Sequence, residues 1–198
     1  MQINRRYNKL FLKAKYLSAE LEEHNYLFEQ YKKDFSEELS LHMKQIDKDV
    51  KSKIENCTKN LLKDLSSDSS SDRDKICEIS KNNIHPDLKK IYRKIMLKIH
   101  PDKTSSIEDE DLKNKYSKLC SAAINAANES NWYMITDVAI ELGIEISDIS
   151  ESHISGLTKS CTEYEKEIKG IKNTYPWVWA NSNLERRKEI MTSYVEKV

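Results

Sequence analysis

The sequence predicts an all-α protein, and three observations lead to this prediction. The chain of 198 residues contains only 3 Gly and 3 Pro, and neither occurs in the first 85 positions, so nothing there forces a helix to break. Charged residues make up 33% of the chain and hydrophobic residues 38%, which suits long amphipathic helices with wide solvated faces. Alternating runs of Val, Ile and Thr, which are typical of strands, do not occur.

Charge balance and cysteine spacing disfavour several classes of function. The 33 basic residues match the 33 acidic ones, so nonspecific nucleic-acid binding through bulk charge is not expected. The four cysteines, at 57, 77, 120 and 161, form no CxxC, which favours reduced thiols over a zinc site or a disulfide framework. The N-terminus has no apolar run long enough for a signal peptide or a membrane span, so we expect a soluble, intracellular, cytoplasmic protein that does not bind a membrane.

Residues 1–65 are predicted to form one long helix. From Phe35 onward the apolar residues are spaced 4, 4 and 3 apart, an eleven-residue period that keeps them on one face. They are Phe35, Leu39, Met43, Ile46, Val50, Ile54, Cys57, Leu61 and Leu65. A helix of this kind cannot bury its stripe alone, so we predict a coiled coil. Its partner is either the C-terminal tail of the same chain or a second copy, which would make a homodimer.

The segment 66–72, SSDSSSD, is predicted to be a polar linker, because Ser and Asp favour turns. Residues 73–143 are expected to form a compact helical domain. Its first helix begins at Pro86, where proline is best tolerated, and ends before Pro101. Ser105 and Glu108 stand at capping-box spacing before the next helix, and a short helix over 132–142 stops at Gly143.

Residues 144–198 are predicted to form a helical tail that packs on the N-terminal helix. Its apolar residues are spaced 4, 3, 4 and 3 apart, which favours an antiparallel partner for the coiled coil. They are Leu157, Cys161, Tyr164, Ile168 and Ile171. The sequence YPWVW at 175–179 is expected to break this helix, and Ser182 with Glu185 at capping-box spacing predicts a last helix.

The tripeptide His-Pro-Asp occurs twice, at 85–87 and at 100–102, in opposite contexts. The first copy is predicted to do no more than start a helix, with Asp87 at the positive end of the helix dipole. The second copy follows a helix, where Pro101 stops the helix and exposes its neighbours. Basic residues surround the second copy: Lys89, Lys90, Arg93, Lys94, Lys98 and Lys103.

The stretch LKKIYRKIMLKIHPDK, residues 88–103, resembles helix II and the HPD loop of the J domain, the signature module of the DnaJ (heat-shock 40-kDa) co-chaperones. The family's helix III pattern is matched by Lys115, Tyr116, Leu119, Ala122 and partly Ala126. The resemblance spans 72–128 and implies an antiparallel helical hairpin at the centre of the chain. The resemblance implies the minimal, J-domain-only type with flanking coiled coils, similar to proteins of giant viruses and protists.

The resemblance implies a protein–protein interaction function, in which the chain binds a 70-kDa heat-shock chaperone and stimulates its ATPase. Asp102 would pair with an arginine of that chaperone, while His100 and Pro101 would fix the shape of the loop. The basic residues Lys89, Lys90, Arg93, Lys94, Lys98 and Lys103 would steer association toward an acidic surface. The client stays unknown, and a viral origin would place the protein in the host cytoplasm or the virion.

A second hypothesis stays open, in which the chain is a coiled-coil scaffold with a degenerate J-like domain that lacks ATPase stimulation. The family's helix I should fall near 72–79, where the residues are DRDKICEI, and Ala123 replaces the large aromatic residue usual in helix III. A nucleic-acid-binding helix at 89–103 is the competing interpretation of the basic residues, but the chain has no recognisable binding motif.

No enzyme activity, metal or cofactor is predicted. No nucleophile–base pair, paired carboxylates or glycine-rich phosphate loop is visible in the sequence. A metal site using His85 and His100 is disfavoured, because they lie at opposite ends of one helix, about 22 Å apart at 1.5 Å per residue. The remaining histidines, His24, His42 and His153, stand alone and are expected to be solvated.

Overall fold

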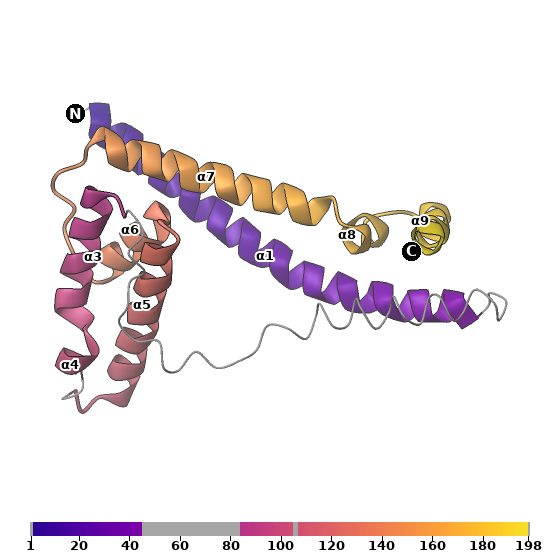
Figure 1. The fold of residues 1–198 in the computed structure, drawn as a ribbon, viewed down its shortest axis with the longest axis horizontal. Coiled ribbons are helices and arrows are strands. Elements are labelled where there is room, and N and C mark those ends of the chain that lie inside the picture. The colour runs from indigo at the N-terminus through magenta and orange to yellow at the C-terminus, as the bar shows by residue number, and fades with distance from the viewer. Residues whose placement is uncertain (1, 45–83, 105–106, 198) are drawn as a thin grey trace. The chain divides into compact units, whose positions relative to one another are not determined.

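The computed structural model describes residues 2–44, 84–104 and 107–197, and in these ranges the chain is all-α, without strands (Figure 1). The predicted fold class is therefore confirmed. The described helices are α1 (Gln2–Lys44), α3 (Pro86–Ile99), α4 (Pro101–Thr104), α5 (Glu110–Asn128), α6 (Trp132–Glu141), α7 (Glu151–Lys172), α8 (Tyr175–Ala180) and α9 (Leu184–Lys197). None of them is both long and apolar enough to cross a membrane.

Two compact units make up the chain, and the division between them falls inside α1 and inside α7. The first unit takes in Met1–Ser18 and Ile76–Glu165, and the second takes in Ala19–Lys75 and Lys166–Val198. The rest of the predicted N-terminal helix, the linker at 66–72 and the segment expected to be helix I at 72–79 lie outside the described residues. The predicted domain boundary at 143 stays a prediction.

The core of the first unit forms where α3, α5 and α6 pack against one another. Helices α3 and α5 lie side by side and are joined at one end through the single turn α4, so they form an antiparallel hairpin (Figure 1). From α3 the side chains of Leu88, Ile95 and Ile99 are at most 1% exposed. Burial stabilises the fold by about 1.5–3 kcal/mol for each such side chain. The apolar face of α3 is therefore held in the core, and its opposite face is left for other contacts.

The helix starts show where the predicted caps were right and wrong. Helix α3 begins at Pro86, as predicted, and Gly143 ends the α6 region with a φ of +66°. The predicted capping residue Ser105 lies outside the described residues, and α5 is capped instead by Asp109, whose carboxylate accepts the N–H of Asp111 at 3.0 Å. Aspartate is as good an N-cap as serine, and this one stands directly before the apolar run.

The predicted cap of α9 was wrong, because a neighbouring residue caps the helix instead. Asn183 Oδ1 accepts the N–H of Arg186 at 2.9 Å, so Asn183 rather than Ser182 caps the helix. The Ser182 hydroxyl donates instead to the carbonyl of Val178 at 2.6 Å. Asparagine and serine are comparable N-caps, so spacing alone could not choose between two neighbouring candidates.

Helices α1 and α7 pair in parallel in the first unit, which corrects the predicted antiparallel arrangement. Arg6 lies 3.7 Å from Glu151, and Lys13 lies 2.7 Å from Glu165, so the residue numbers rise together along both helices. The segment 143–150 carries the chain from α6 back to the first turns of α1 before α7 begins. The buried residues of this pair include Tyr7, Ala14, Leu17, Ile154, Leu157 and Cys161.

The second unit has its own core around Phe35. The side chains of Phe35, Leu39, Met43, Trp179, Ile190 and Met191 form this core. Phe35 and Trp179 meet edge to face, with ring centroids 5.7 Å apart. The predicted burial of the stripe is thus confirmed for 35–43, and its remainder at 46–65 lies outside the described residues. The stretch 175–179 does interrupt the tail, but it is itself helical, as α8, with its proline in the first turn where it is tolerated.

Candidate functional site

The second His-Pro-Asp copy forms a tight turn at the end of α3. His100 Nδ1 accepts the backbone N–H of Asp102 at 3.3 Å, and Lys103 Nζ donates to the carbonyl of Leu97 at 2.8 Å. The hydroxyl of Thr104 lies 3.4 Å from the carbonyl of His100, to which it donates. The Asp102 side chain is 88% exposed, and its Oδ2 lies 3.4 Å from His100 Nδ1. A carboxylate is therefore presented to solvent on a turn whose backbone is fixed.

The basic residues of α3 fall into two rows. Lys90, Lys94 and Lys98 are four residues apart, so they lie along one edge of the helix. Lys94 Nζ donates to the carbonyl of Glu145 at 3.4 Å, and Lys98 Nζ donates to the carbonyl of Leu142. The carbonyl of Leu142 belongs to the C-terminal end of α6, where a helix carries partial negative charge. These two lysines thus hold α3 to the end of α6 and to the segment that follows it.

The other row faces solvent. Lys89 and Arg93 are exposed, and their side chains make no hydrogen bond or ion pair with another described residue. Leu97 continues the row and is 67% exposed. A shallow groove of about 400 Å³ runs beside it, and its lining residues are Tyr92, Arg93, Met96, Leu97, His100, Asp102 and Lys103. The Asp102 turn and this row therefore form one continuous surface, which we call the HPD surface.

The first His-Pro-Asp copy has the same local turn but different surroundings. His85 Nδ1 accepts the N–H of Asp87 at 3.3 Å, as in the second copy. The Asp87 carboxylate, however, accepts the hydroxyl of Ser152 at 2.6 Å, that of Ser150 at 3.2 Å and Lys90 Nζ at 3.1 Å. These hydrogen bonds, that of Ser152 above all, hold the pKa of Asp87 well below its usual range. The first copy therefore fastens α3 to the start of α7, beyond starting a helix.

His153 is buried, so the prediction that it is solvated was wrong. The side chain is 4% exposed and meets Trp132 edge to face, with ring centroids 5.2 Å apart. Its Nδ1 accepts the backbone N–H of Ser150 at 3.2 Å, directly before α7. Burial lowers the pKa of His153. A signal was present in the sequence: His153 follows Ser150 at capping-box spacing, with histidine in the place usual for glutamate.

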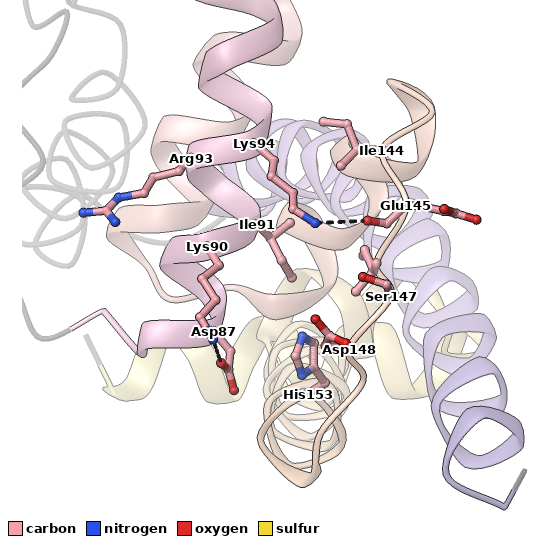
Figure 2. A pocket seen from close by; sticks show the side chains of 11 residues that line it. Asp87, Lys90, Ile91, Arg93, Lys94, Ile144, Glu145, Ser147, Asp148 and His153 are labelled. Carbon is pink, nitrogen blue, oxygen red and sulfur yellow. Dashed lines mark hydrogen bonds and ion pairs between the residues drawn. The ribbon is translucent and has the colours of Figure 1, made fainter.

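A pocket of about 300 Å³ lies between α3 and the segment 144–148 (Figure 2). Lys94 reaches across it to Glu145, whereas the Arg93 guanidinium points away on the opposite side of α3. Asp87 and His153 line the same pocket. Serine, histidine and aspartate thus lie close together, which raises the question of a catalytic triad.

The contacts among these groups run in a different order from those of a catalytic triad. In a catalytic triad the aspartate orients the imidazole, which in turn activates the serine. Here the Asp87 carboxylate accepts the hydroxyls of Ser150 and Ser152, whereas His153 Nδ1 lies 2.8 Å from Ser150 Oγ and also accepts the backbone N–H of Ser150. Within the described ranges no cluster of three or more His, Cys, Asp or Glu side chains is placed to hold a metal ion.

Comparisons with protein-family models, with curated proteins and with solved structures find no match to this chain. Function is therefore inferred from the residues of the chain itself. Of the predicted site residues, His100, Pro101, Asp102, Lys103, Lys89 and Arg93 lie together on or beside the HPD surface. Lys90, Lys94 and Lys98 lie on the neighbouring edge of α3, where Lys90 contacts Asp87 of the same helix and the other two donate to the carbonyls of Glu145 and Leu142.

Proposed function

We propose that this chain is a J-domain co-chaperone that binds a 70-kDa heat-shock chaperone through the HPD surface and stimulates its ATPase. The observation that carries the proposal is the Asp102 carboxylate, which is 88% exposed on a turn whose backbone is tied to α3. A carboxylate held in this way suits bidentate recognition by an arginine, which is geometrically specific. Little conformational entropy would be lost on binding, because the turn is already ordered.

The other residues of the HPD surface would contribute to binding in two ways, through charge and through apolar contact. Arg93 places positive charge beside the turn and Lys89 adds charge one helical turn further along α3, so they would speed association with an acidic surface and make it sensitive to salt. Leu97 and Met96 line the groove and would supply apolar contact area in the bound state. The buried face of α3 keeps these groups in a fixed relation to Asp102.

The alternative is a scaffold protein in which the J-like hairpin no longer stimulates ATP hydrolysis. The observation that favours it is the use of Lys94 and Lys98 within the chain, since each donates to a backbone carbonyl of the first unit. These lysines would then stabilise the hairpin and contribute little to docking. The alternative keeps protein–protein interaction as the function but assigns it to the helices that flank the hairpin.

ATP hydrolysis by purified 70-kDa heat-shock chaperones distinguishes the two. The purified chain should accelerate single-turnover hydrolysis by at least one such chaperone, and raised salt should weaken the effect, because steering by Lys89 and Arg93 is screened. Far-ultraviolet circular dichroism would verify that the added protein is helical. A folded chain that accelerates hydrolysis by none of several chaperones would favour the scaffold.

A further inference from the structure

Helix α1 carries a second stripe of residues, on the face opposite to the one that packs within the chain. On the packed face Tyr7, Ala14 and Phe35 are buried, and they are separated by multiples of seven residues. On the opposite face the residues follow one another at alternating steps of four and three, as the a and d positions of a heptad do, and all of them are exposed. They are Arg5, Lys9, Leu12, Tyr16, Ala19, Glu23 and Tyr26, which we call the outer stripe.

Three large apolar side chains lie on the outer stripe. Leu12 is 65% exposed, and Tyr16 and Tyr26 are 66% exposed. Single exposed apolar residues are common, but these three share one heptad register along a single helix, as residues of a coiled-coil seam do. The stripe begins in the first unit and ends in the second, and its register is that of α1 itself, which is one uninterrupted helix (Figure 1). The outer stripe is therefore a candidate helix-pairing surface.

Charge is divided along the same part of α1. Residues 2–18 include five basic residues and no acidic one, whereas residues 19–30 include four acidic residues and no Lys or Arg. Three of the five basic residues lie within 4.0 Å of carboxylates on α6 or α7. On the outer stripe, however, Arg5, Lys9 and Glu23 make no hydrogen bond or ion pair with another described residue. These charges are therefore available to a partner.

We propose that the outer stripe is a dimer interface, on which the α1 helices of two copies of this chain pair in antiparallel. With the two-fold axis at position 14, Leu12 meets the second copy's Tyr16, and Arg5 faces the second copy's Glu23. Each contact occurs twice, and an a position faces a d position at every layer. The basic run of one copy thus lies along the acidic run of the other. This dimer does not depend on the proposed co-chaperone function.

Charge and apolar character select this register over the others. A parallel pair in register would set Arg5 against Arg5 and Glu23 against Glu23, and like charges at such positions repel. An antiparallel pair shifted by one heptad in one direction would set Leu12 against Glu23. Shifted in the other direction, it would set Lys9 against Leu12. Only the pairing centred on position 14 matches apolar residues with apolar ones and opposite charges with each other.

A second copy also fits the outer stripe better than other occupants do. An anionic lipid surface attracts an exposed basic helix face. However, the acidic run at 19–30 continues the stripe and would be repelled by such a surface. A second copy satisfies the basic run and the acidic run together. The apolar stripe predicted from Phe35 onward cannot pair with a second copy over 35–43, because it is buried there in the core of the second unit.

Sedimentation equilibrium of the full chain measures the association. The wild-type chain should form a dimer that weakens as salt is raised, because the paired charges are screened. Arg5→Glu and Glu23→Lys each set like charges opposite each other at two places, so each should raise the dissociation constant of the dimer by about tenfold. Glu38→Lys makes the same charge change as Glu23→Lys at an exposed position of α1 beyond the overlap, so it should leave the constant unchanged.

A mixture of the two weakened variants tests the register. In a mixed dimer of Arg5→Glu with Glu23→Lys, the new glutamate faces the new lysine and the unchanged Arg5 faces the unchanged Glu23, so wild-type affinity should return. A mixture that associates no better than its components would overturn the proposal, and so would a dimer that Arg5→Glu tightens, as a parallel pair requires. A wild-type chain that stays monomeric would also overturn it, whether or not that monomer binds phosphatidylserine vesicles; this outcome needs no variant to fold.

Discussion

Ser152 Oγ donates a 2.6 Å hydrogen bond to the Asp87 carboxylate, and this bond distinguishes the two His-Pro-Asp copies. In both copies the histidine Nδ1 accepts the aspartate N–H at 3.3 Å, so the local turn is the same. The Asp87 side chain is only 24% exposed, whereas that of Asp102 is 88% exposed. The same tripeptide therefore places a carboxylate that is hydrogen-bonded to α7 at the start of α3, and a solvent-exposed carboxylate at its end.

The two faces of α3 should respond differently to truncation. Ile95→Ala removes a fully buried side chain and should lower the free energy of unfolding by about 2–5 kcal/mol, because it leaves a cavity in the core. Leu97→Ala truncates a side chain that is 67% exposed, so it should change the free energy of unfolding by less than about 0.5 kcal/mol. Urea denaturation followed by circular dichroism measures both. Equal losses from the two substitutions would show that α3 is not packed as described.

Two glycines of α7 provide a second matched pair. A Cβ at Gly156 would lie 2.2 Å from ring atoms of Trp132, so Gly156→Ala should destabilise the chain by about 1–3 kcal/mol through overpacking. A Cβ at Gly170 would meet nothing within 4 Å, so Gly170→Ala should stabilise the helix by about 0.5–1 kcal/mol. Thermal unfolding of the two variants should give shifts of opposite sign. A neutral Gly156→Ala would mean that Trp132 does not lie against α7.

Stability should fall on mild acidification because of His153. Burial lowers the pKa of this side chain, so below its ordinary value of about 6.5 the unfolded chain binds more protons than the folded one. The stabilising effect is complete above about pH 6.5 and is lost as pH falls through the lowered pKa of the folded state. Urea titrations at several pH values should show this slope, and His153→Asn should flatten it. If the free energy of unfolding of the wild-type chain instead rose as the pH was lowered through this window, the burial of a neutral imidazole would be contradicted.

Substitutions in the two rows of basic residues on α3 should have different effects, one on chaperone docking and the other on the stability of the chain. Arg93→Gln should slow association with the chaperone at low salt, while changing the free energy of unfolding by less than about 0.5 kcal/mol. Lys98→Gln removes the same charge, but it loses the bond to the Leu142 carbonyl and should destabilise the chain by about 1 kcal/mol. Stopped-flow association and urea denaturation give the two readouts. If both variants slow association equally, the whole basic face docks and the division into rows is wrong.

Much of the fold could be predicted because local signals agree with the packing. Pro86 and Pro101 bracket α3 as expected, and Gly143 ends the α6 region with a positive φ. Four of the five heptad residues of the tail are buried, and the fifth, Ile171, is half-buried. The direction in which α7 pairs with α1 could not be predicted, because an apolar stripe specifies a face and not a direction. That direction depends on where the segment 143–150 returns the chain.

The candidate site could be predicted in part. The sequence singled out the 100–102 turn as the exposed copy, and Asp102 is exposed. It treated the 85–87 copy as a helix start alone, because the serines that bind Asp87 lie more than sixty positions away and only tertiary structure brings them close. His153 was missed for a related reason: a lone histidine is usually solvated, and the cap that buries it uses an uncommon residue at a common position.

The measurement that tests the central claim most directly is single-turnover ATP hydrolysis by a 70-kDa heat-shock chaperone with Asp102→Asn and, as its matched control, Asp87→Asn. Both variants replace the aspartate of a His-Pro-Asp turn, and circular dichroism checks that each remains folded. Loss of one charge-assisted hydrogen bond to the chaperone should weaken stimulation by Asp102→Asn about 10- to 100-fold. Asp87→Asn should retain stimulation, since Asp87 is bound within the chain. Stimulation that survives in a folded Asp102→Asn protein would contradict the account.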